Sequence, residues 1–219
     1  MKRVNLFLGH YGSGKTNIAV NFAFKLRKEG FPVAIADLDI VNPYFRTKDS
    51  EEDLKKAGIE VISLPFANTS VDLPSLPSEA YSLVQNRERY AVLDIGGDDR
   101  GAYALGRYVP SIRSENDYDM FFVANFYRPL TTTPEEALEV LREIENACGL
   151  PFTAIINNSN LGSETTAGDV LQTTERARKL SELSGLPLVM TTVRADLAAS
   201  LQNEIPDLFP LTLQKKITD

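Results

Sequence analysis

The stretch Gly9-His10-Tyr11-Gly12-Ser13-Gly14-Lys15-Thr16 decides how the rest of this 219-residue chain is interpreted. It fulfils every fixed position of the pattern G-x-x-x-x-G-K-[S/T], which is typical of a loop that wraps the phosphates of a nucleotide. An apolar run, Val4–Leu8, precedes the loop and an amphipathic segment, Thr16–Lys28, follows it. The loop is therefore expected between a strand and a helix, where such loops occur, and chance would produce the pattern in about one chain of this length in a hundred.

Each part of this loop has a physical role in holding phosphate. Glycines adopt positive φ angles and let backbone N–H groups approach phosphate oxygens closely. The start of the next helix adds partial positive charge, Lys15 is expected to reach the β- and γ-phosphates, and the Thr16 hydroxyl is expected to bind Mg²⁺. We therefore predict that the nucleotide contacts Gly9, Gly12, Ser13, Gly14, Lys15 and Thr16, with Lys15 also acting in catalysis.

Short apolar runs alternate with longer helical segments along the chain. The predicted strands are Val4–Leu8, Val33–Ala36, Val61–Leu64, Tyr90–Leu93, Met120–Val123, Phe152–Ile156 and Leu186–Met190. Their nearly continuous apolar character is typical of strands covered on both faces. The pattern predicts a single α/β domain over residues 1–219, with a doubly wound, mostly parallel sheet of about seven strands and helices on both faces. The proline-rich stretch Pro65–Ser78 is expected to be a surface excursion.

Two further helices are predicted, and the first of them carries clear start and stop signals. Thr133-Pro134-Glu135-Glu136 combines an N-cap, a first-turn proline and a capping-box glutamate, and Gly149 follows at the expected end. A third helix is predicted from about Thr166 to Leu183. Gly185 and Pro187 are expected to end this third helix.

Acidic residues follow two of the predicted strands. Asp37 and Asp39 lie at the end of the second strand, and Asp94 lies at the end of the fourth, with Gly97 shortly after it. Ligands of an open parallel sheet bind outside the carboxyl ends of the strands, which is also the edge of the phosphate loop. Acids there can hold magnesium or orient an attacking water, and the Gly97 N–H can bind a γ-phosphate. The alternative is that these aspartates only form turns or helix caps.

The D-x-D sequence at one strand end and the Asp-x-x-Gly sequence at another resemble the MinD/ParA/CobQ branch of P-loop NTPases, in the SIMIBI class. The resemblance extends from Met1 to about Thr191. It implies that Asp39 is a catalytic acid beside the attacking water, that Asp37 lies near the magnesium ion and that Asp94 is the Walker-B-type acid. Together with Thr16, Asp37 and Asp94 are thus the expected metal-binding residues.

The chain departs from that family at one position of the phosphate loop. Members that act on a partner's site carry an early lysine, in the form K-G-G-x-G-K-[S/T]. In this chain His10 occupies that position and Tyr11 follows it. The resemblance therefore does not extend to a dimer built on that lysine, and we expect His10 to pack on its own loop. The alternative is that His10 replaces the lysine as a donor.

The run Asn157-Asn158-Ser159-Asn160 ends the sixth predicted strand, where guanine-specific relatives carry N-K-x-D. In that pattern the final carboxylate accepts two hydrogens from guanine. The amide of Asn160 cannot accept both, so guanine selectivity should weaken. Asn157 can exchange hydrogen bonds with adenine, which favours ATP over GTP. The alternative is that these asparagines only terminate a strand.

Composition excludes several other functions. The net charge of −7 and the pI near 4.9 make nucleic acid an unlikely partner. No apolar run approaches the ~20 residues that span a bilayer, and the tail Asp207–Asp219 has too few basic residues to dock on a membrane. The single cysteine, Cys148, is expected in the core and fits a reducing, cytoplasmic location, and the single histidine, His10, argues against a His-rich metal site.

These observations favour an ATP-binding protein with slow, Mg²⁺-dependent ATPase activity that is coupled to a protein partner, a target or a second copy of the chain. The segments Asp37–Arg46 and Asp94–Arg100 are the expected switches. One alternative is an ATP-dependent enzyme of cofactor or small-molecule metabolism, such as a kinase, ligase or amidotransferase-like protein. Its second substrate would contact Pro65–Ser78 and three arginines, Arg100, Arg107 and Arg128. Another alternative is a regulator that binds ATP without hydrolysing it.

Overall fold

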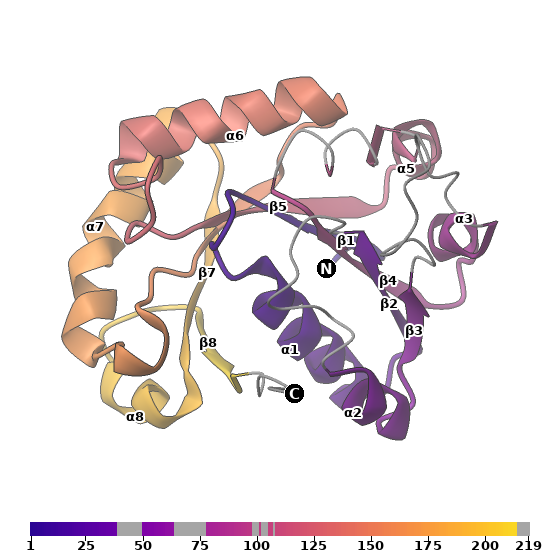
Figure 1. The fold of residues 1–219 in the computed structure, drawn as a ribbon, viewed down its shortest axis with the longest axis horizontal. Coiled ribbons are helices and arrows are strands. Elements are labelled where there is room, and N and C mark those ends of the chain that lie inside the picture. The colour runs from indigo at the N-terminus through magenta and orange to yellow at the C-terminus, as the bar shows by residue number, and fades with distance from the viewer. Residues whose placement is uncertain (39–49, 64–77, 98–100, 102–104, 107, 214–219) are drawn as a thin grey trace, which may run out of the picture.

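The structure is a computed structural model that describes residues 1–38, 50–63, 78–97, 101, 105–106 and 108–213. Within them, eight strands form one parallel sheet in the order β3-β2-β4-β1-β5-β6-β7-β8 (Figure 1). The strands are β1 (Val4–Leu8), β2 (Val33–Leu38), β3 (Glu60–Ser63), β4 (Tyr90–Ile95), β5 (Tyr118–Ala124), β6 (Ala154–Asn157), β7 (Leu188–Arg194) and β8 (Leu208–Leu211). The helices labelled in Figure 1 are α1 (Lys15–Lys28), α2 (Glu51–Lys56), α3 (Ser78–Gln85), α5 (Val109–Glu115), α6 (Pro134–Cys148), α7 (Ala167–Ser184) and α8 (Ala198–Leu201). The predicted α/β fold is confirmed.

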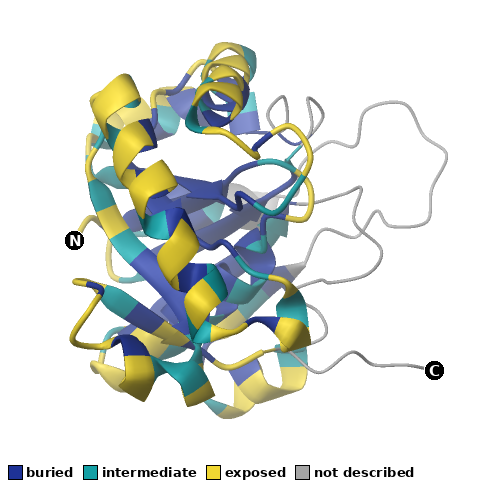
Figure 2. Cartoon of the chain, turned by 90° about the vertical axis from the view of Figure 1, so that its left-hand side faces the viewer, coloured by how far each residue is buried: buried dark blue, intermediate teal, exposed yellow. Residues whose placement is uncertain are grey.

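Strand β1 shows why this sheet needs helices on both faces. Leu6 and Leu8 belong to one buried cluster with α3, α5, α6 and α7, whereas Phe7 belongs to a second cluster with α1 and α2. All three side chains are completely buried, because successive residues of a strand point to opposite faces. Figure 2 shows the result as buried strands between helices whose outer faces are exposed. The two clusters hold the strands in place, so their carboxyl ends form a fixed edge.

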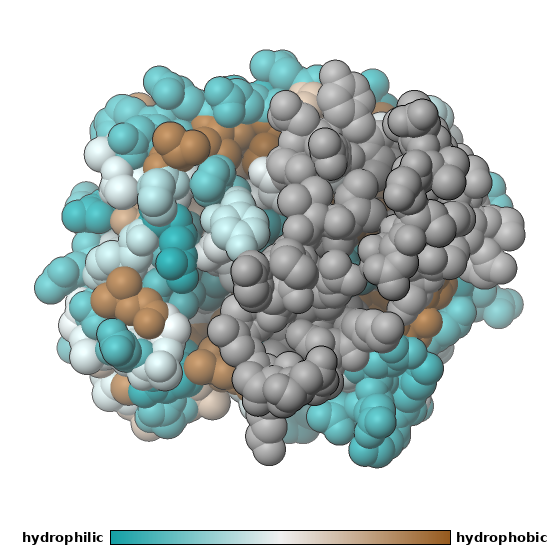
Figure 3. All heavy atoms as spheres, in the orientation of Figure 1, coloured by the Kyte–Doolittle hydropathy of each residue, from teal (hydrophilic) through white to brown (hydrophobic). Residues whose placement is uncertain are grey.

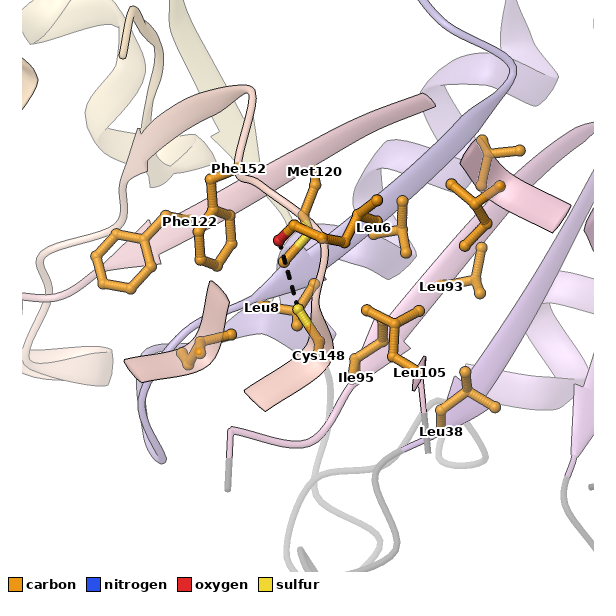
Figure 4. Close-up of a cluster of buried hydrophobic side chains, with 14 of the residues drawn as sticks. Leu6, Leu8, Leu38, Leu93, Ile95, Leu105, Met120, Phe122, Cys148 and Phe152 are labelled. Atoms are coloured by element: carbon orange, nitrogen blue, oxygen red, sulfur yellow. Dashed lines mark hydrogen bonds between the residues drawn. The ribbon is translucent and has the colours of Figure 1, made fainter. Parts of the chain in front are cut away.

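The first cluster contains the only cysteine of the chain. Cys148 lies among leucine and phenylalanine side chains such as Leu8 and Phe122 and is 4% exposed (Figure 4). Its Sγ lies 3.5 Å from the carbonyl oxygen of Leu150. Burial raises the pKa of the thiol. The prediction of a core cysteine is confirmed.

Helix α6 begins with the signals that were expected, and α7 begins with a capping box that was not predicted. At α6, Thr133 accepts a hydrogen bond from the Glu136 N–H, and the Glu136 side chain accepts one in return from the Thr133 N–H. At α7, Thr166 and Asp169 form the same reciprocal pair. Each box satisfies two N–H groups that the helix itself cannot bind and so stabilises the first turn of its helix.

The eighth strand was not predicted. Residues 208–211 belong to the segment Asp207–Asp219, which we interpreted as a tail, and Pro210 interrupts the apolar pattern there. Pro210 is exposed and lies on an edge strand, where a missing N–H is tolerated. Its neighbours Phe209 and Leu211 are buried against α1, and Asn21 exchanges hydrogen bonds of 3.0 and 2.9 Å with the backbone of Thr212. Packing against α1 therefore makes a strand of a sequence with weak strand character.

The described surface is mostly hydrophilic on the face seen in Figure 3, with a few separate hydrophobic patches. Among the described residues, no helix is both long and apolar enough to cross a bilayer. The excursion predicted over Pro65–Ser78 falls almost entirely outside the described residues.

Candidate nucleotide-binding site

The loop of residues 9–14 joins the carboxyl end of β1 to the first turn of α1. Two of its glycines are required by close backbone approach. A Cβ on Gly9 would lie 2.3 Å from the Val123 carbonyl oxygen, and a Cβ on Gly14 would lie 2.2 Å from Asn158 Nδ2. Gly14 also has a φ of 88°, which other residues rarely adopt. The sequence pattern therefore marks a turn packed too tightly for side chains at these positions.

Lys15 and Thr16 begin α1 and are both buried, at 5% and 6% exposed. The Lys15 Nζ atom lies 3.4 Å from the His10 carbonyl oxygen, which is long for a hydrogen bond. The ring of His10 lies on the same loop, with Nδ1 3.1 Å from the Tyr11 carbonyl oxygen.

The predicted metal-binding acids lie side by side. Asp37 on β2 and Asp94 on β4 are register partners, and Asp94 is completely buried. Gly97 lies against the phosphate loop, since a Cβ there would be 2.2 Å from the Gly9 carbonyl oxygen and 3.0 Å from Lys15 Nζ. The fold thus brings Asp37, Asp94 and Gly97 to the edge that carries Lys15. Asp39, most of the predicted switch Asp37–Arg46 and the last three residues of the predicted switch Asp94–Arg100 lie outside the described residues.

This arrangement fits magnesium better than a metal held only by protein. Within the described ranges, no group of three or more histidine, cysteine or acidic side chains is placed to hold an ion. Magnesium keeps several waters and is usually bound by one or two carboxylates together with phosphate oxygens. The Thr16 hydroxyl and the Asp37 and Asp94 carboxylates supply hard oxygen donors of that kind. These residues therefore fit the ion that was expected.

A cavity of about 620 Å³ extends from the loop across the ends of β6, β7 and β8. Its apolar lining includes Val170, Val193, Leu211 and Leu213. Three cationic side chains line it as well, and the described lining contains no carboxylate; the cations are Lys15, Arg128 and Arg194. In a chain of net charge −7, this local excess of positive charge attracts an anionic ligand to one place. The apolar part suits a planar base.

Asn158 connects the cavity to the phosphate loop. Its Nδ2 donates a 2.6 Å hydrogen bond to the Ser13 carbonyl oxygen, and its Oδ1 accepts a hydrogen bond from the Thr192 hydroxyl. The neighbouring Asn157, which we predicted to contact the base, lies in the protein interior and is completely buried. Asn158 lines the cavity and Asn157 does not. The sequence alone offered no reason to choose between these adjacent amides.

The side chain of Asn157 is used inside the protein. Its Oδ1 accepts hydrogen bonds from the Ser159 N–H at 3.2 Å and the Ser159 hydroxyl at 2.7 Å, and its Nδ2 donates to Thr173 Oγ1 at 3.3 Å. The Ser159 hydroxyl in turn accepts from the Phe126 N–H at 3.0 Å. Asn157 therefore fixes the loop that carries Asn158, and its contact with a base stays a prediction.

Two arginines line the cavity in different ways. Arg194, at the end of β7, donates two hydrogen bonds of 2.5 and 2.8 Å to the Asp196 carboxylate and a third to the Ser163 carbonyl oxygen. The hydrogen bond from Arg194 lowers the pKa of Asp196. Arg128 instead donates from Nε to the Gly12 carbonyl oxygen at 3.0 Å. Sequence analysis missed Arg194 and assigned Arg128 to a second pocket, together with Arg100 and Arg107, which lie outside the described residues.

A glycine-rich loop between β1 and α1 of a parallel sheet, with Lys15 and Thr16 at its end and acids on the next strands, defines a P-loop nucleotide-binding protein. The chain belongs to the CobQ/CobB/MinD/ParA nucleotide-binding domain family, whose sequence model matches residues 9–170. The resemblance inferred from the motifs is thus confirmed. No match was found among curated protein sequences.

Solved structures of the signal recognition particle receptor FtsY share the fold. FtsY from Thermotoga maritima is 18% identical with a TM-score of 0.58, over 88% of this chain and 62% of that one. Chloroplast FtsY from Physcomitrella patens is 19% identical with a TM-score of 0.58, over 87% and 58%. FtsY from Elizabethkingia anophelis in complex with GDP is 15% identical with a TM-score of 0.54, over 88% and 58%. The match therefore covers only about three fifths of those chains, and identities this low establish the fold alone.

Proposed function

We propose that this protein binds ATP with Mg²⁺ and hydrolyses it slowly, in a cycle coupled to a protein partner, a target or a second copy of the chain. The observation that carries the proposal is the composition of the cavity beside the phosphate loop. Its described lining holds Lys15, Arg128 and Arg194 without a carboxylate, while Asp37 and Asp94 lie side by side at the ends of β2 and β4. One end of the site thus suits phosphates and a base, and the other suits a divalent cation.

The chain's own groups have separate roles in this proposal. Lys15 and the backbone N–H groups of the loop bind and orient the phosphates, because they concentrate positive charge at the start of α1. Thr16, Asp37 and Asp94 would hold Mg²⁺, which neutralises charge on the β- and γ-phosphates when bound. Gly97 N–H would bind the γ-phosphate. Asp39 would accept a hydrogen bond from the attacking water and so orient it.

The preference for adenine rests on the described end of the cavity. Asp196 is already bound by Arg194. The amide of Asn160 is also occupied, since its Nδ2 donates to the Asn158 carbonyl oxygen at 2.7 Å and its Oδ1 accepts from the Gly162 N–H at 3.1 Å. Neither group is placed to accept both hydrogens of a guanine edge. The GDP named in one FtsY structure does not decide the base here, because that likeness shows the fold alone.

We place this activity in the cytoplasm, away from membranes and nucleic acids. The acidic net charge of −7 opposes binding to phosphate polymers and anionic lipids. The buried thiol of Cys148 has no disulfide, which is compatible with a reducing compartment.

The test compares the wild-type protein with Asp39→Ala and with Asp53→Ala, which removes an exposed acid of α2 as a matched control. Each protein is assayed with Mg²⁺ for ATP and GTP binding by calorimetry and for phosphate release. We expect all three to bind ATP more tightly than GTP, and phosphate release to be lost only in Asp39→Ala.

Other outcomes would redirect the proposal. Tight ATP binding without phosphate release from any of the three would indicate a regulator, or an enzyme that needs an acceptor. Tighter GTP binding would contradict the adenine assignment. Failure to bind either nucleotide at micromolar concentration would contradict the assignment of the loop.

A further inference from the structure

The side chain of Arg128, which follows strand β5, contacts the phosphate loop at Gly12. Its Nε donates a 3.0 Å hydrogen bond to the Gly12 carbonyl oxygen. A Cβ on Gly12 would lie 3.5 Å from that Nε and 3.6 Å from Cδ, so the arginine side chain runs along the surface of this residue. Arg128 lines the same cavity as Lys15 and Thr16. Its guanidinium is therefore placed at the loop that is expected to wrap the phosphates.

The charge of Arg128 differs from those of the other cations in the cavity. Arg194 is neutralised by Asp196, and Lys15 is held at the start of α1. Arg128 is half-buried, and in the part of the chain that the structure describes no carboxylate forms an ion pair with it and neither Nη atom donates a hydrogen bond. Partial burial without an anionic neighbour raises the electrostatic energy of a cation. An anion that enters the cavity would lower this electrostatic energy.

The turn that carries Arg128 is fixed before any ligand binds. The Arg128 N–H donates to the Asn125 carbonyl oxygen at 3.1 Å, and the Thr131 hydroxyl donates to the same oxygen at 2.8 Å. The side chain of Asn125 is completely buried and accepts from the Tyr127 N–H at 3.1 Å and the Asn160 N–H at 3.3 Å. Because the backbone is held on several sides, little ordering of it opposes a contact made by this arginine.

We propose that Arg128 is a second phosphate-binding residue, which contacts the polyphosphate chain of the nucleotide beside Gly12 and acts together with Lys15. This inference rests on the proposed nucleotide binding. The Nε–Gly12 bond anchors the guanidinium, and the two Nη groups form the planar fork that binds phosphate oxygens in pairs. The ligand chemistry is thus that of a nucleoside di- or triphosphate.

A purely structural role makes a different prediction from a phosphate contact. If Arg128 only holds Gly12 in place, its loss should weaken every ligand of the site by the same factor. If it binds phosphate, the loss should grow with the number of phosphates and should persist for a ligand without a base. Affinities for AMP, ADP, ATP and inorganic tripolyphosphate separate the two roles.

The experiment uses wild-type protein, Arg128→Gln, Arg128→Lys and the matched control Arg113→Gln. Arg113 also donates to a glycine carbonyl oxygen, that of Gly149 at 2.6 Å, but it lies on α5 and does not line the cavity. Dissociation constants for the four ligands are measured by calorimetry, and thermal unfolding confirms that each variant is folded.

We expect Arg128→Gln to weaken ATP and tripolyphosphate by about 10- to 100-fold and AMP by much less. Arg128→Lys should recover part of the loss, because it keeps the charge without the fork, and Arg113→Gln should change nothing. Equal losses for all four ligands, or no loss, would overturn the proposal while leaving nucleotide binding intact. If the wild-type protein binds neither ATP nor tripolyphosphate, the assignment of the loop itself is wrong.

Discussion

The carboxyl edge of the sheet has two halves with different chemistry, and β1 with its phosphate loop lies between them. On the side of β2 and β4, the strand-end side chains are the acids Asp37 and Asp94. On the side of β5 to β7, the buried polar side chains at the strand ends are neutral amides and hydroxyls, represented by Asn125, Asn158 and Thr192. The first half suits a cation and the second suits a nucleoside, so the ligand is expected to lie across the junction.

The two halves also differ in how their buried polar groups are stabilised. Buried amides and hydroxyls can satisfy one another inside the protein, as Asn158 does with Ser13 and Thr192. A buried carboxylate such as Asp94 must be compensated by charge or hydrogen bonds, and a magnesium ion at Thr16 would add to that compensation. The buried amide of Asn158 in the neutral half is therefore satisfied without a ligand.

The largest expected effect comes from a change at the junction itself. Lys15→Gln should weaken ATP by about a hundredfold or more and remove phosphate release, because both halves depend on the phosphates it binds. Calorimetry and a phosphate-release assay measure this, with Lys179→Gln on the exposed face of α7 as the control. Normal ATP affinity in Lys15→Gln would contradict the inference that the two halves of the edge bind one shared ligand.

A change in the acidic half should affect the metal and spare the base. Asp94→Asn keeps the shape of the side chain but removes its charge, so phosphate release should fall by about a hundredfold. Affinity for ATP measured in EDTA should stay within a factor of about three. Titration with Mg²⁺ at fixed ATP checks the assignment of Asp94 as a metal-binding residue. The same Mg²⁺ dependence of phosphate release in Asp94→Asn and in the wild type would contradict it.

A change in the neutral half should weaken nucleotide binding and leave the Mg²⁺ dependence as it is. Asn158→Ala removes the bond to the Ser13 carbonyl oxygen, which should weaken ATP by about tenfold and lower the free energy of unfolding by about 1–3 kcal/mol. The Mg²⁺ requirement should not change. Thr133→Ala loses the cap of α6, at about 1 kcal/mol, and serves as a control for stability: its ATP affinity should remain normal.

The smallest effect is expected from pH. The Arg194 hydrogen bond lowers the pKa of Asp196, so the pair is intact above the ordinary aspartate pKa and is lost only as pH falls through the lowered value. The ratio of ATP to tripolyphosphate affinity should therefore stay constant between about pH 6 and about pH 8. A change in that range that Asp196→Asn abolishes would contradict this assignment.

The sequence predicted the parts of the site that lie close together along the chain. Gly9 to Thr16 form one continuous pattern, and Asp94 follows a strand whose apolar run is unmistakable. The position of Arg128 over Gly12 depends instead on which loops meet at the edge of the sheet. A single sequence does not specify these contacts between distant loops. The same holds for Arg194 and Ser163.

The sequence could not show which of Asn157 and Asn158 lines the cavity, for a related reason. Adjacent residues at a strand end point to opposite sides, so the assignment depends on where the strand stops, to within one residue. Strand β6 ends at Asn157, and this places Asn158 toward the loop. Strand β8 was missed because burial against α1, not its own pattern with Pro210, determines its structure.

The 2.6 Å bond between Asn158 and the Ser13 carbonyl oxygen has a consequence for binding measured with fragments. Since the group beside the base holds the backbone that wraps the phosphates, filling one part of the site helps to order the other. Adenosine and tripolyphosphate added together should then bind cooperatively, each raising the affinity of the other, although no covalent bond joins them. In Asn158→Ala the two fragments should bind independently, and the advantage of the intact nucleotide over its pieces should shrink to that of the covalent link alone.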